Sequence, residues 1–429
     1  MRASLRSRIV RQVISRPDPV ARIRSLMAGS GASAVTLFYE VGDPWSHLCA
    51  RWLARHRAGL DCALRIQLVP ETDAVLFPEP ERQRHYAIAD TQQMAPGWEI
   101  QLPPTLHWPD ADLRRQVERA LIATDGLEAW LACEEHLIPA LLGNDRPALQ
   151  KKLSALPLAS TETTATSLAQ GAAQRRRLGH YLPAMWHYRG DWFWGLDRIP
   201  HLMSKLRRHH ALAAKACPQE TIIPSKLNLP EIQRNTPLEF YYSFRSPYSF
   251  LAAQKLRTQI DAWPVKLVIR PVLPMVMRGF QVPRIKRLYI ARDTYREAAK
   301  QRIDFGLVED PLGPGILQGL QLFEHFEDSR SQLDFLCHYG SASWARGLNV
   351  MDPEVARQAV ERAGGNWTEA QGLLKPGFEP PWVPVNRQAL LDRGLWGVPS
   401  FTLGNWQIWG QDRMPLLEEA MARSTSRHG

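Results

Sequence analysis

The amino-acid sequence predicts an α/β protein built from two tandem copies of one domain, because three landmarks recur in the same order in both halves. The first landmark reads LFYEVGDPWSHLCARWL from residue 37 and FYYSFRSPYSFLAAQKL from residue 240. The second reads RHYAIADT from residue 84 and RLYIARDT from residue 287. The third is W-G-x-D-R-x-P, which starts at Trp194 and again at Trp409. Three landmarks in one order indicate a duplication rather than chance.

The opening elements of the second copy predict a β-α-β unit. Residues 238–244 (LEFYYSF) are apolar and rich in aromatic side chains, which is typical of a buried strand. Ser246 suits the N-cap and Pro247 the first position of a helix over 247–260. The β-branched run VKLVIRPV (265–272) then predicts a second strand that runs parallel to the first.

A long, mostly helical stretch follows, and the copy closes with a hairpin and a helix. Asp352-Pro353 marks the start of one helix in this stretch, and Gly364-Gly365 marks its end. SFTLGNWQIWG (400–410) predicts two short strands around a turn, and DRMPLLEEAMARS predicts the last helix. The order β-α-β, helical insert, α-β-β-α is that of a thioredoxin fold with a helical insertion. Gly397-Val398-Pro399 falls where such folds carry a cis-proline.

The landmarks place the two domains at residues 31–206 and 235–429. Residues 207–234 contain prolines without clean periodicity and are predicted to form a linker. Residues 1–30 hold seven arginines and one aspartate, which is more than half of the formal net charge of +10. This basic leader lacks the apolar core of a secretory signal. It therefore predicts a helix on the protein's own surface, a mitochondrial presequence or a segment that touches anionic lipid.

Composition and charge exclude several classes of protein. No apolar run approaches the roughly 20 residues of a membrane helix, so no integral membrane segment is expected. The charge is concentrated in the leader and no recognition motif is present, which argues against nucleic-acid binding. The cysteines are scattered without a C-x-x-C pair, which argues against a disulfide framework, a zinc site and a dithiol redox centre. A reducing cytoplasm is the expected location, and formation of a homodimer stays open.

The second copy resembles the DsbA-like thioredoxin superfamily. Within it, the motifs are similar to those of the branch that holds 2-hydroxychromene-2-carboxylate isomerases and kappa-class glutathione transferases. FYYSFRSPYSFLA is close to the branch signature S-P-Y/F-S-Y/F-L-A, and GVPSF with WGQDRMPLLEEAM is close to G-V-P-T/S-F with W-G-x-D-R-L. The resemblance runs through the whole second copy, while the first copy resembles the branch more weakly at the same landmarks.

Ser246 is the predicted catalytic residue. Thioredoxin-like enzymes place a cysteine at the start of this helix, where the helix dipole and unpaired N–H groups stabilise a thiolate. Because Ser246 takes that place, the sulfur would have to come from another molecule. The resemblance implies that this molecule is glutathione and that Ser246 orients its thiolate. The alternative is that Ser246 only caps the helix.

The resemblance also implies the remaining glutathione contacts. Val398 and Pro399 would dock the cysteinyl unit by backbone pairing, or else form only a tight turn. Backbone N–H groups of Gln411 and Asp412 would bind the γ-glutamyl carboxylate, and the Asp412 side chain would pair with the ammonium group, or else serve as a plain cap. Lys286 would approach the ligand or lie on a solvated helix face.

The first copy departs from this pattern, because Asp43 stands where the second copy has Ser246. A carboxylate repels a neighbouring thiolate and raises the pKa of the thiol, although it still caps a helix. We therefore expect a degenerate copy that kept its fold. An acid–base pair of Asp43 with His47 is a second interpretation of these residues.

The implied activity is that of a glutathione-dependent isomerase acting on a small aromatic hydroxychromene carboxylate or a related enone. The thiolate would add to a conjugated carbon, and elimination would return glutathione. Three alternatives remain: a kappa-type glutathione transferase, a DsbA-family thiol-disulfide oxidoreductase-like protein that lacks C-x-x-C, and a non-catalytic binding scaffold.

Overall fold

The computed structural model describes residues 3–16, 34–72, 79–213 and 229–426, and the chain divides into two compact units. The N-terminal unit comprises residues 17–228, and the C-terminal unit comprises residues 229–429 together with residues 1–16. Parts of two predicted segments, residues 17–30 of the leader and 214–228 of the linker, lie outside the described residues.

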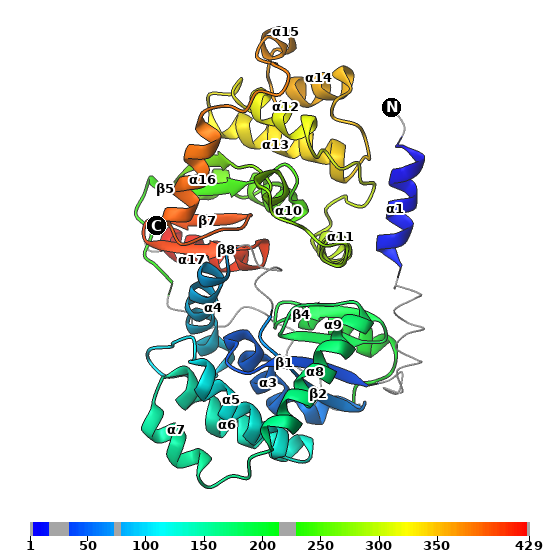
Figure 1. Cartoon of the computed structure of the whole chain (residues 1–429). Coiled ribbons are helices and arrows are strands. Elements are labelled where there is room, and N and C mark those ends of the chain that lie inside the picture. Colours follow the sequence, from blue (N-terminus) through cyan, green and yellow to red (C-terminus); the bar gives the residue numbers. More distant parts are fainter. Residues whose placement is uncertain (1–2, 17–33, 73–78, 214–228, 427–429) are drawn as a thin grey trace. The chain divides into compact units, whose positions relative to one another are not determined.

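Each unit holds a four-stranded sheet, and the two sheets have the same topology. Figure 1 shows strands of each sheet among the helices of their own unit. The first sheet has the order β2-β1-β3-β4, and the second has the order β6-β5-β7-β8. In each sheet the first two strands of the chain are parallel, and the two later strands are antiparallel to their neighbours. The strands are β1 Val35–Glu40, β2 Leu64–Val69, β3 Met185–Tyr188, β4 Asp191–Trp194, β5 Thr236–Tyr242, β6 Val265–Pro271, β7 Ser400–Leu403 and β8 Trp406–Trp409. This arrangement confirms the predicted α/β fold with two thioredoxin-like units.

Helices α4–α8 separate β2 from β3, and helices α11–α16 separate β6 from β7, which is the predicted helical insertion.

The full set of helices in the N-terminal unit is α3 Pro44–His56, α4 Pro80–Met94, α5 Ala111–Ala123, α6 Leu127–Leu142, α7 Arg146–Leu153, α8 Thr161–Leu178 and α9 Ile199–Arg208. In the C-terminal unit they are α1 Leu5–Ser15, α10 Pro247–Arg257, α11 Arg284–Gln301, α12 Pro314–Phe323, α13 Ser329–Trp344, α14 Pro353–Arg362, α15 Trp367–Gln371, α16 Trp382–Asp392 and α17 Met414–Ser426. Helix α10 is three residues shorter than predicted, because the chain turns at Thr258 into a short 3-10 helix.

The first helix of each unit begins as the sequence predicts. The Asp43 carboxylate accepts a hydrogen bond from the N–H of Ser46 at 2.9 Å, and the Ser246 hydroxyl accepts one from the N–H of Ser249 at 3.1 Å. A proline follows each cap, where its missing N–H costs no hydrogen bond. The two helix starts, α3 and α10, are therefore equivalent positions at the carboxyl ends of β1 and β5.

A second equivalent contact joins these helices to the insertions. The Trp45 indole N–H donates to Asp90 at 2.8 Å, and the Tyr248 hydroxyl donates to Asp293 at 2.7 Å. Both aspartates are buried, and both belong to the second sequence landmark. An aromatic donor and a buried aspartate at equivalent positions thus join α3 to α4 in one unit and α10 to α11 in the other.

The core of the C-terminal unit fixes the strand that leads to Ser246. Leu238, Phe240 and Tyr242 of β5 alternate toward a large apolar cluster with α12 and α13. The ring of Phe240 stacks on that of Phe401, with 4.8 Å between the centroids. Because β5 is buried, the turn at its end is held by the core.

None of the helices in the described ranges combines the length and the apolar character that a membrane span requires.

Candidate functional site

Ser246 links the start of α10 to a segment far away in the chain. While its oxygen caps the helix, its hydroxyl donates to the carbonyl of Val398 at 3.3 Å, across 152 residues. Ser246 is partly exposed, whereas Ser243 and Ser249 on either side of it are buried. Ser246 is therefore a partly exposed residue between two buried serines.

The peptide bond between Val398 and Pro399 is cis, as expected for this fold. The Pro399 carbonyl accepts from the N–H of Gly410 at 2.8 Å, and the Ser400 hydroxyl donates to the Gly397 carbonyl at 2.7 Å. A side chain at Gly397 would come within 2.6 Å of the Trp409 indole nitrogen, so glycine is needed there. Val398 alone is partly exposed in this turn, which puts its backbone beside Ser246.

Gln411 and Asp412 lie in a short 3-10 turn directly before α17. The Gln411 side chain is buried and its amide is used within the fold: it accepts from Gln301 at 2.6 Å and donates to Glu297 at 3.1 Å and to the Asp412 carboxylate. Gln411 thus holds the carboxylate of Asp412, which is itself partly exposed. The Gln411 side chain acts as a bridge between α11 and the start of α17.

Helix α11 holds both ends of this candidate site. Asp293 of α11 binds Tyr248 at the start of α10 and also Arg296 at 3.0 Å. Further along, Glu297 and Gln301 bind the turn before α17. Lys286 lies in the first turn of the same helix, where burial lowers the pKa of its amine.

An ion pair beside Ser246 was not expected from the sequence. The Arg245 guanidinium forms two parallel hydrogen bonds with the Asp310 carboxylate, at 3.0 Å from Nε and 2.8 Å from Nη2. Such a bidentate pair fixes orientation as well as charge. The two residues are 65 positions apart and belong to no motif, so no local pattern signals their contact.

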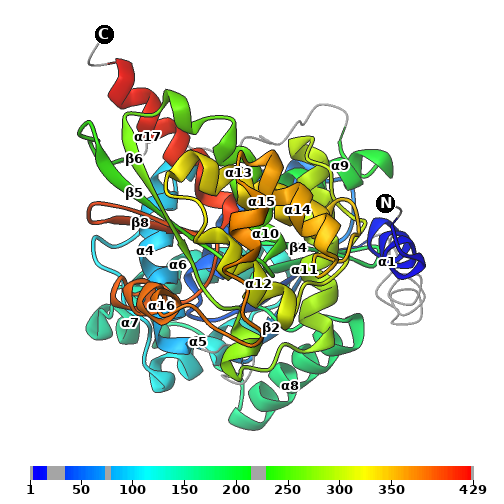
Figure 2. The same cartoon turned by 90° about the horizontal axis from the view of Figure 1, so that it is seen from above.

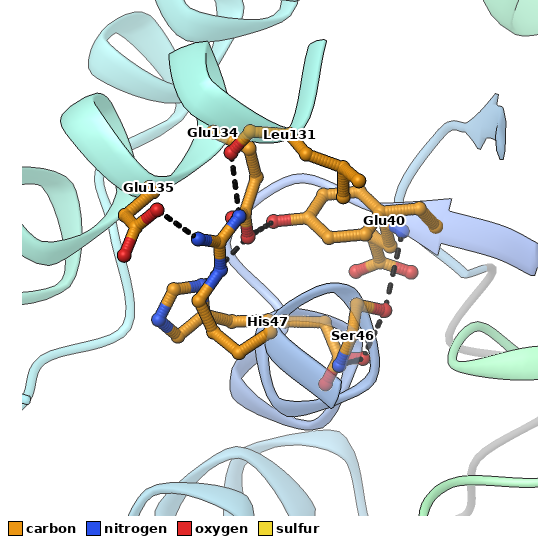
Figure 3. A network of polar contacts seen from close by, with 9 residues as sticks. Glu40, Ser46, His47, Leu131, Glu134 and Glu135 are labelled. Carbon is orange, nitrogen blue, oxygen red and sulfur yellow. Dashed lines mark hydrogen bonds and ion pairs between the residues drawn. The ribbon is translucent and has the colours of Figure 1, made fainter. Parts of the chain in front are cut away.

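The equivalent position in the N-terminal unit is closed. Asp43 and Ser46 are buried, and the Ser46 hydroxyl donates to the Asp43 carboxylate at 2.6 Å (Figure 3). The same hydroxyl oxygen accepts from the backbone N–H groups of Glu40 at 3.3 Å and Ala184 at 3.1 Å. Within the described residues the Val398-Pro399 bond is the only cis peptide, so Pro183 does not repeat it. The cap Asp43 is thus buried and bonded to Ser46, whereas its counterpart Ser246 is partly exposed.

Two buried carboxyls at this closed position hold their protons unusually strongly. Burial raises the pKa of Glu40 to about 8, with the neighbouring Asp43 and Glu71 adding to the effect. Burial likewise raises the pKa of Asp43 to about 6, although hydrogen bonds from Ser46 oppose it. Neither carboxyl supplies the positive charge that stabilises a thiolate.

His47 pairs with Glu134 rather than with Asp43, which overturns the acid–base pair that the sequence left open. The His47 Nδ1 lies 2.6 Å from the Glu134 carboxylate, and that carboxylate also accepts from the Tyr39 hydroxyl at 2.8 Å (Figure 3). Arg51 contacts the other oxygen of Glu134 at 2.6 Å. This buried network, which joins α3 to α6, is a structural tie inside the unit.

None of the described cysteines stands at the first turn of α3 or α10: Cys49 lies inside α3, six residues after its cap Asp43, and the others lie outside both helices. Cys49, Cys133 and Cys337 are buried, and Cys62 is half-buried. Burial raises the pKa of the Cys337 thiol to about 12 and that of Cys49 well above its ordinary value. These thiols are not poised as thiolates near neutral pH.

Comparison with known proteins concerns the C-terminal unit. Residues 237–422 match the model of the DSBA-like thioredoxin domain, so the C-terminal unit contains a domain of this kind. The chain is 24% identical over 201 residues to a 2-hydroxychromene-2-carboxylate isomerase of Pseudomonas putida, which covers 43% of this chain and 94% of the relative. It is 25% identical over 206 residues to Glutathione S-transferase kappa 1 of Homo sapiens, which covers 42% of this chain and 88% of the relative.

Solved structures give the same kind of neighbour. A structure of selenomethionine 2-hydroxychromene-2-carboxylate isomerase is 21% identical in sequence and has a TM-score of 0.37, covering 45% of this chain and 97% of that chain. A probable DsbA oxidoreductase from Streptomyces coelicolor is 16% identical with a TM-score of 0.35, covering 45% of this chain and 91% of that chain.

Proposed function

We propose that the C-terminal unit is a glutathione-dependent isomerase that acts on a small aromatic hydroxychromene carboxylate or a related enone. The observation that carries this proposal is the partly exposed hydroxyl of Ser246, at the start of α10 and 3.3 Å from the carbonyl of Val398. The names of the two sequence relatives support isomerisation and glutathione use.

The residues at this position fit a glutathione thiolate. Ser246 offers a hydroxyl proton, and the N-terminus of α10 adds partial positive charge. Val398 is partly exposed beside a cis peptide bond, and its backbone would pair with the cysteinyl unit of glutathione. Asp412, held by Gln411, would meet the ammonium group of the γ-glutamyl unit. The helix end and hydroxyl would thus meet the negative sulfur of glutathione, and the Asp412 carboxylate would meet its positive ammonium group.

In the proposed reaction, glutathione supplies a sulfur nucleophile that adds to a conjugated carbon and leaves again after bond rotation. The role of Ser246 is to hold negative charge on that sulfur. Its proton now points to the Val398 carbonyl, and rotation about the Cβ–Oγ bond can present it to a closer acceptor. Asp293 and Gln411 keep the two sides of the site in place through α11. No protein side chain needs to form a covalent bond.

Conjugation of glutathione to an electrophile is a second candidate, and the relationship to Glutathione S-transferase kappa 1 favours it. Both reactions need the same thiolate and the same Ser246. They differ only in whether the sulfur leaves the carbon again, so product analysis separates them.

The proposal is tested with wild-type protein and Ser246→Ala. The wild type is expected to be retained on immobilised glutathione and to turn over a hydroxychromene carboxylate only when glutathione is present. We expect turnover by Ser246→Ala to fall at least tenfold, because the hydroxyl proton is lost from the developing thiolate. Equal turnover by the two proteins would leave Ser246 as a helix cap only. Turnover without glutathione would exclude the proposed chemistry.

A further inference from the structure

Helix α1 is attached to the C-terminal unit by one face. Ser7 is fully buried on this face, and Ile14 is only 5% exposed. Val10 and Ile14 pack with an apolar cluster contributed by α10, α11 and the end of α13. At the start of the helix, the Ser4 hydroxyl donates to the Glu309 carboxylate at 3.0 Å. The first helix of the chain is therefore part of a folded domain.

The fit of α1 also fixes its rotation about its own axis. Gly347 has a positive φ of 62°, and a Cβ there would come within 2.6 Å of the Ser7 hydroxyl oxygen. The loop after α13 can approach α1 this closely only because it has no side chain at Gly347. A helix held at this distance presents one constant face away from its domain. Figure 2 shows α1 at the edge of the unit, beside α11.

That outer face carries an apolar stripe. Leu5, Ile9 and Val13 are 74%, 53% and 43% exposed, and they lie on one side of the helix because they are spaced four residues apart. Eight large apolar side chains of the described residues are strongly exposed, and three of the eight are Leu5, Ile9 and Val13. The other five lie singly elsewhere in the chain. Single exposed apolar residues are ordinary, but a row of three on one short helix marks an interaction surface.

Arginines flank the stripe, and the helix that carries it has no acidic residue of its own. Arg6 and Arg8 flank it on its two sides, and Arg11 and Arg16 continue the basic character along the helix; all four are exposed. The sequence of α1 contains no aspartate or glutamate. Among the described residues, no carboxylate forms an ion pair with these four arginines. The outer face of α1 is thus both apolar and positively charged.

We infer that the outer face of α1 binds the surface of an anionic lipid bilayer. Leu5, Ile9 and Val13 enter the boundary between headgroups and acyl chains, and the flanking arginines pair with anionic headgroups. A second copy of the chain is a poorer occupant, because a two-fold pairing of this face brings the same arginines together. The inner face stays on the domain, so the catalytic candidate site is held at the membrane surface without a spanning helix.

The test uses the full chain and sedimentation with vesicles. We expect binding to vesicles of phosphatidylcholine with phosphatidylglycerol and weak binding to pure phosphatidylcholine. Replacing Arg6→Gln and Arg8→Gln together should weaken binding by about fivefold for each arginine. Replacing Leu5→Gln and Ile9→Gln together should weaken it at least tenfold. Raising the salt concentration should reduce binding, because these charges are exposed.

Matched controls lie on α16, where Val385 and Arg387 are exposed on a different element. Val385→Gln and Arg387→Gln should bind vesicles as the wild type does, and near-ultraviolet circular dichroism should show all variants folded. Equal binding to neutral and anionic vesicles, or unchanged binding by both α1 double variants, would overturn the inference. So would an α1 variant that loses self-association in sedimentation velocity and keeps vesicle binding, since the stripe would then belong to a second copy.

Discussion

At the scale of single residues, Ser246 and Asp43 show how one position can serve two purposes. Each caps a helix with a side-chain oxygen, which accepts a hydrogen bond from the backbone N–H of the residue three positions later. Ser246 also carries a proton that it can donate, whereas the Asp43 carboxylate accepts hydrogen bonds and repels anions. Both units therefore have a side-chain cap at this position, but only the C-terminal unit has a hydroxyl donor there.

This comparison predicts the behaviour of Ser246→Asp. Aspartate caps a helix about as well as serine but cannot donate to the Val398 carbonyl, so the free energy of unfolding should fall by about 1–2 kcal/mol through loss of that hydrogen bond. Its carboxylate raises the pKa of a neighbouring thiol, so glutathione-dependent turnover should fall at least tenfold. Urea unfolding and a turnover assay measure the two properties separately. Wild-type turnover by this variant would show that capping is the whole role of Ser246.

Residues also differ in how far the sequence could predict them. Ser246 and Pro247 follow local rules of helix starts, and the expected position of a cis-proline in a thioredoxin fold placed Val398 opposite them. The pairing of Arg245 with Asp310 and of Gln411 with Glu297 joins distant positions without a motif, so it could not be foreseen. The closed site around Asp43 depends on packing by Ser46 and Ala184, which only coordinates reveal.

At the scale of elements, the end of β1 carries a pH-dependent contribution to stability. Glu40 is the last residue of the strand, and its carboxylate accepts from the N–H and hydroxyl of Thr72, each at 3.2 Å. Its folded pKa of about 8 exceeds that of an unfolded glutamate, so the folded state binds the proton more tightly. The free energy of unfolding therefore falls as the pH rises from about 4.5 to about 8.

We predict that Glu40→Gln raises the melting temperature of the N-terminal unit more at pH 8.5 than at pH 5. Glutamine keeps an oxygen that can accept from Thr72 and has no proton to lose, so the decline with pH should shrink. Scanning calorimetry at the two pH values measures the difference, with Glu162→Gln as an exposed control on α8. An equal effect of Glu40→Gln at both pH values would contradict the raised pKa.

At the scale of the whole molecule, the two units share a topology but differ in the burial and the polar contacts of the residue that caps their first helix. The chain order of strands and helices could be predicted for both units, because cap residues, turns and apolar runs are local signals. The place of α1 could not, because its partners Phe250, Phe305 and Trp344 lie more than two hundred residues away. A basic segment at the start of a sequence gives no sign of the domain on which it packs.

The packing of α1 predicts a long-range effect of Ile14→Ala. Removing a side chain this buried should cost the C-terminal unit about 2–4 kcal/mol. Ile9→Ala is the matched control on the exposed face of the same helix and should cost less than about 0.5 kcal/mol. Calorimetry with residue-specific hydrogen exchange would assign the loss to the C-terminal unit. Similar losses for both variants would contradict the packing of Ile14.

The attachment of α1 has a consequence for biosynthesis. The ribosome makes Val10 and Ile14 roughly 330 residues before Trp344, which belongs to the same cluster. At about 5–20 residues per second, these apolar side chains wait on the order of 15–70 seconds for their partners. The C-terminal domain can therefore complete the packing of α1 only after α13 has been made.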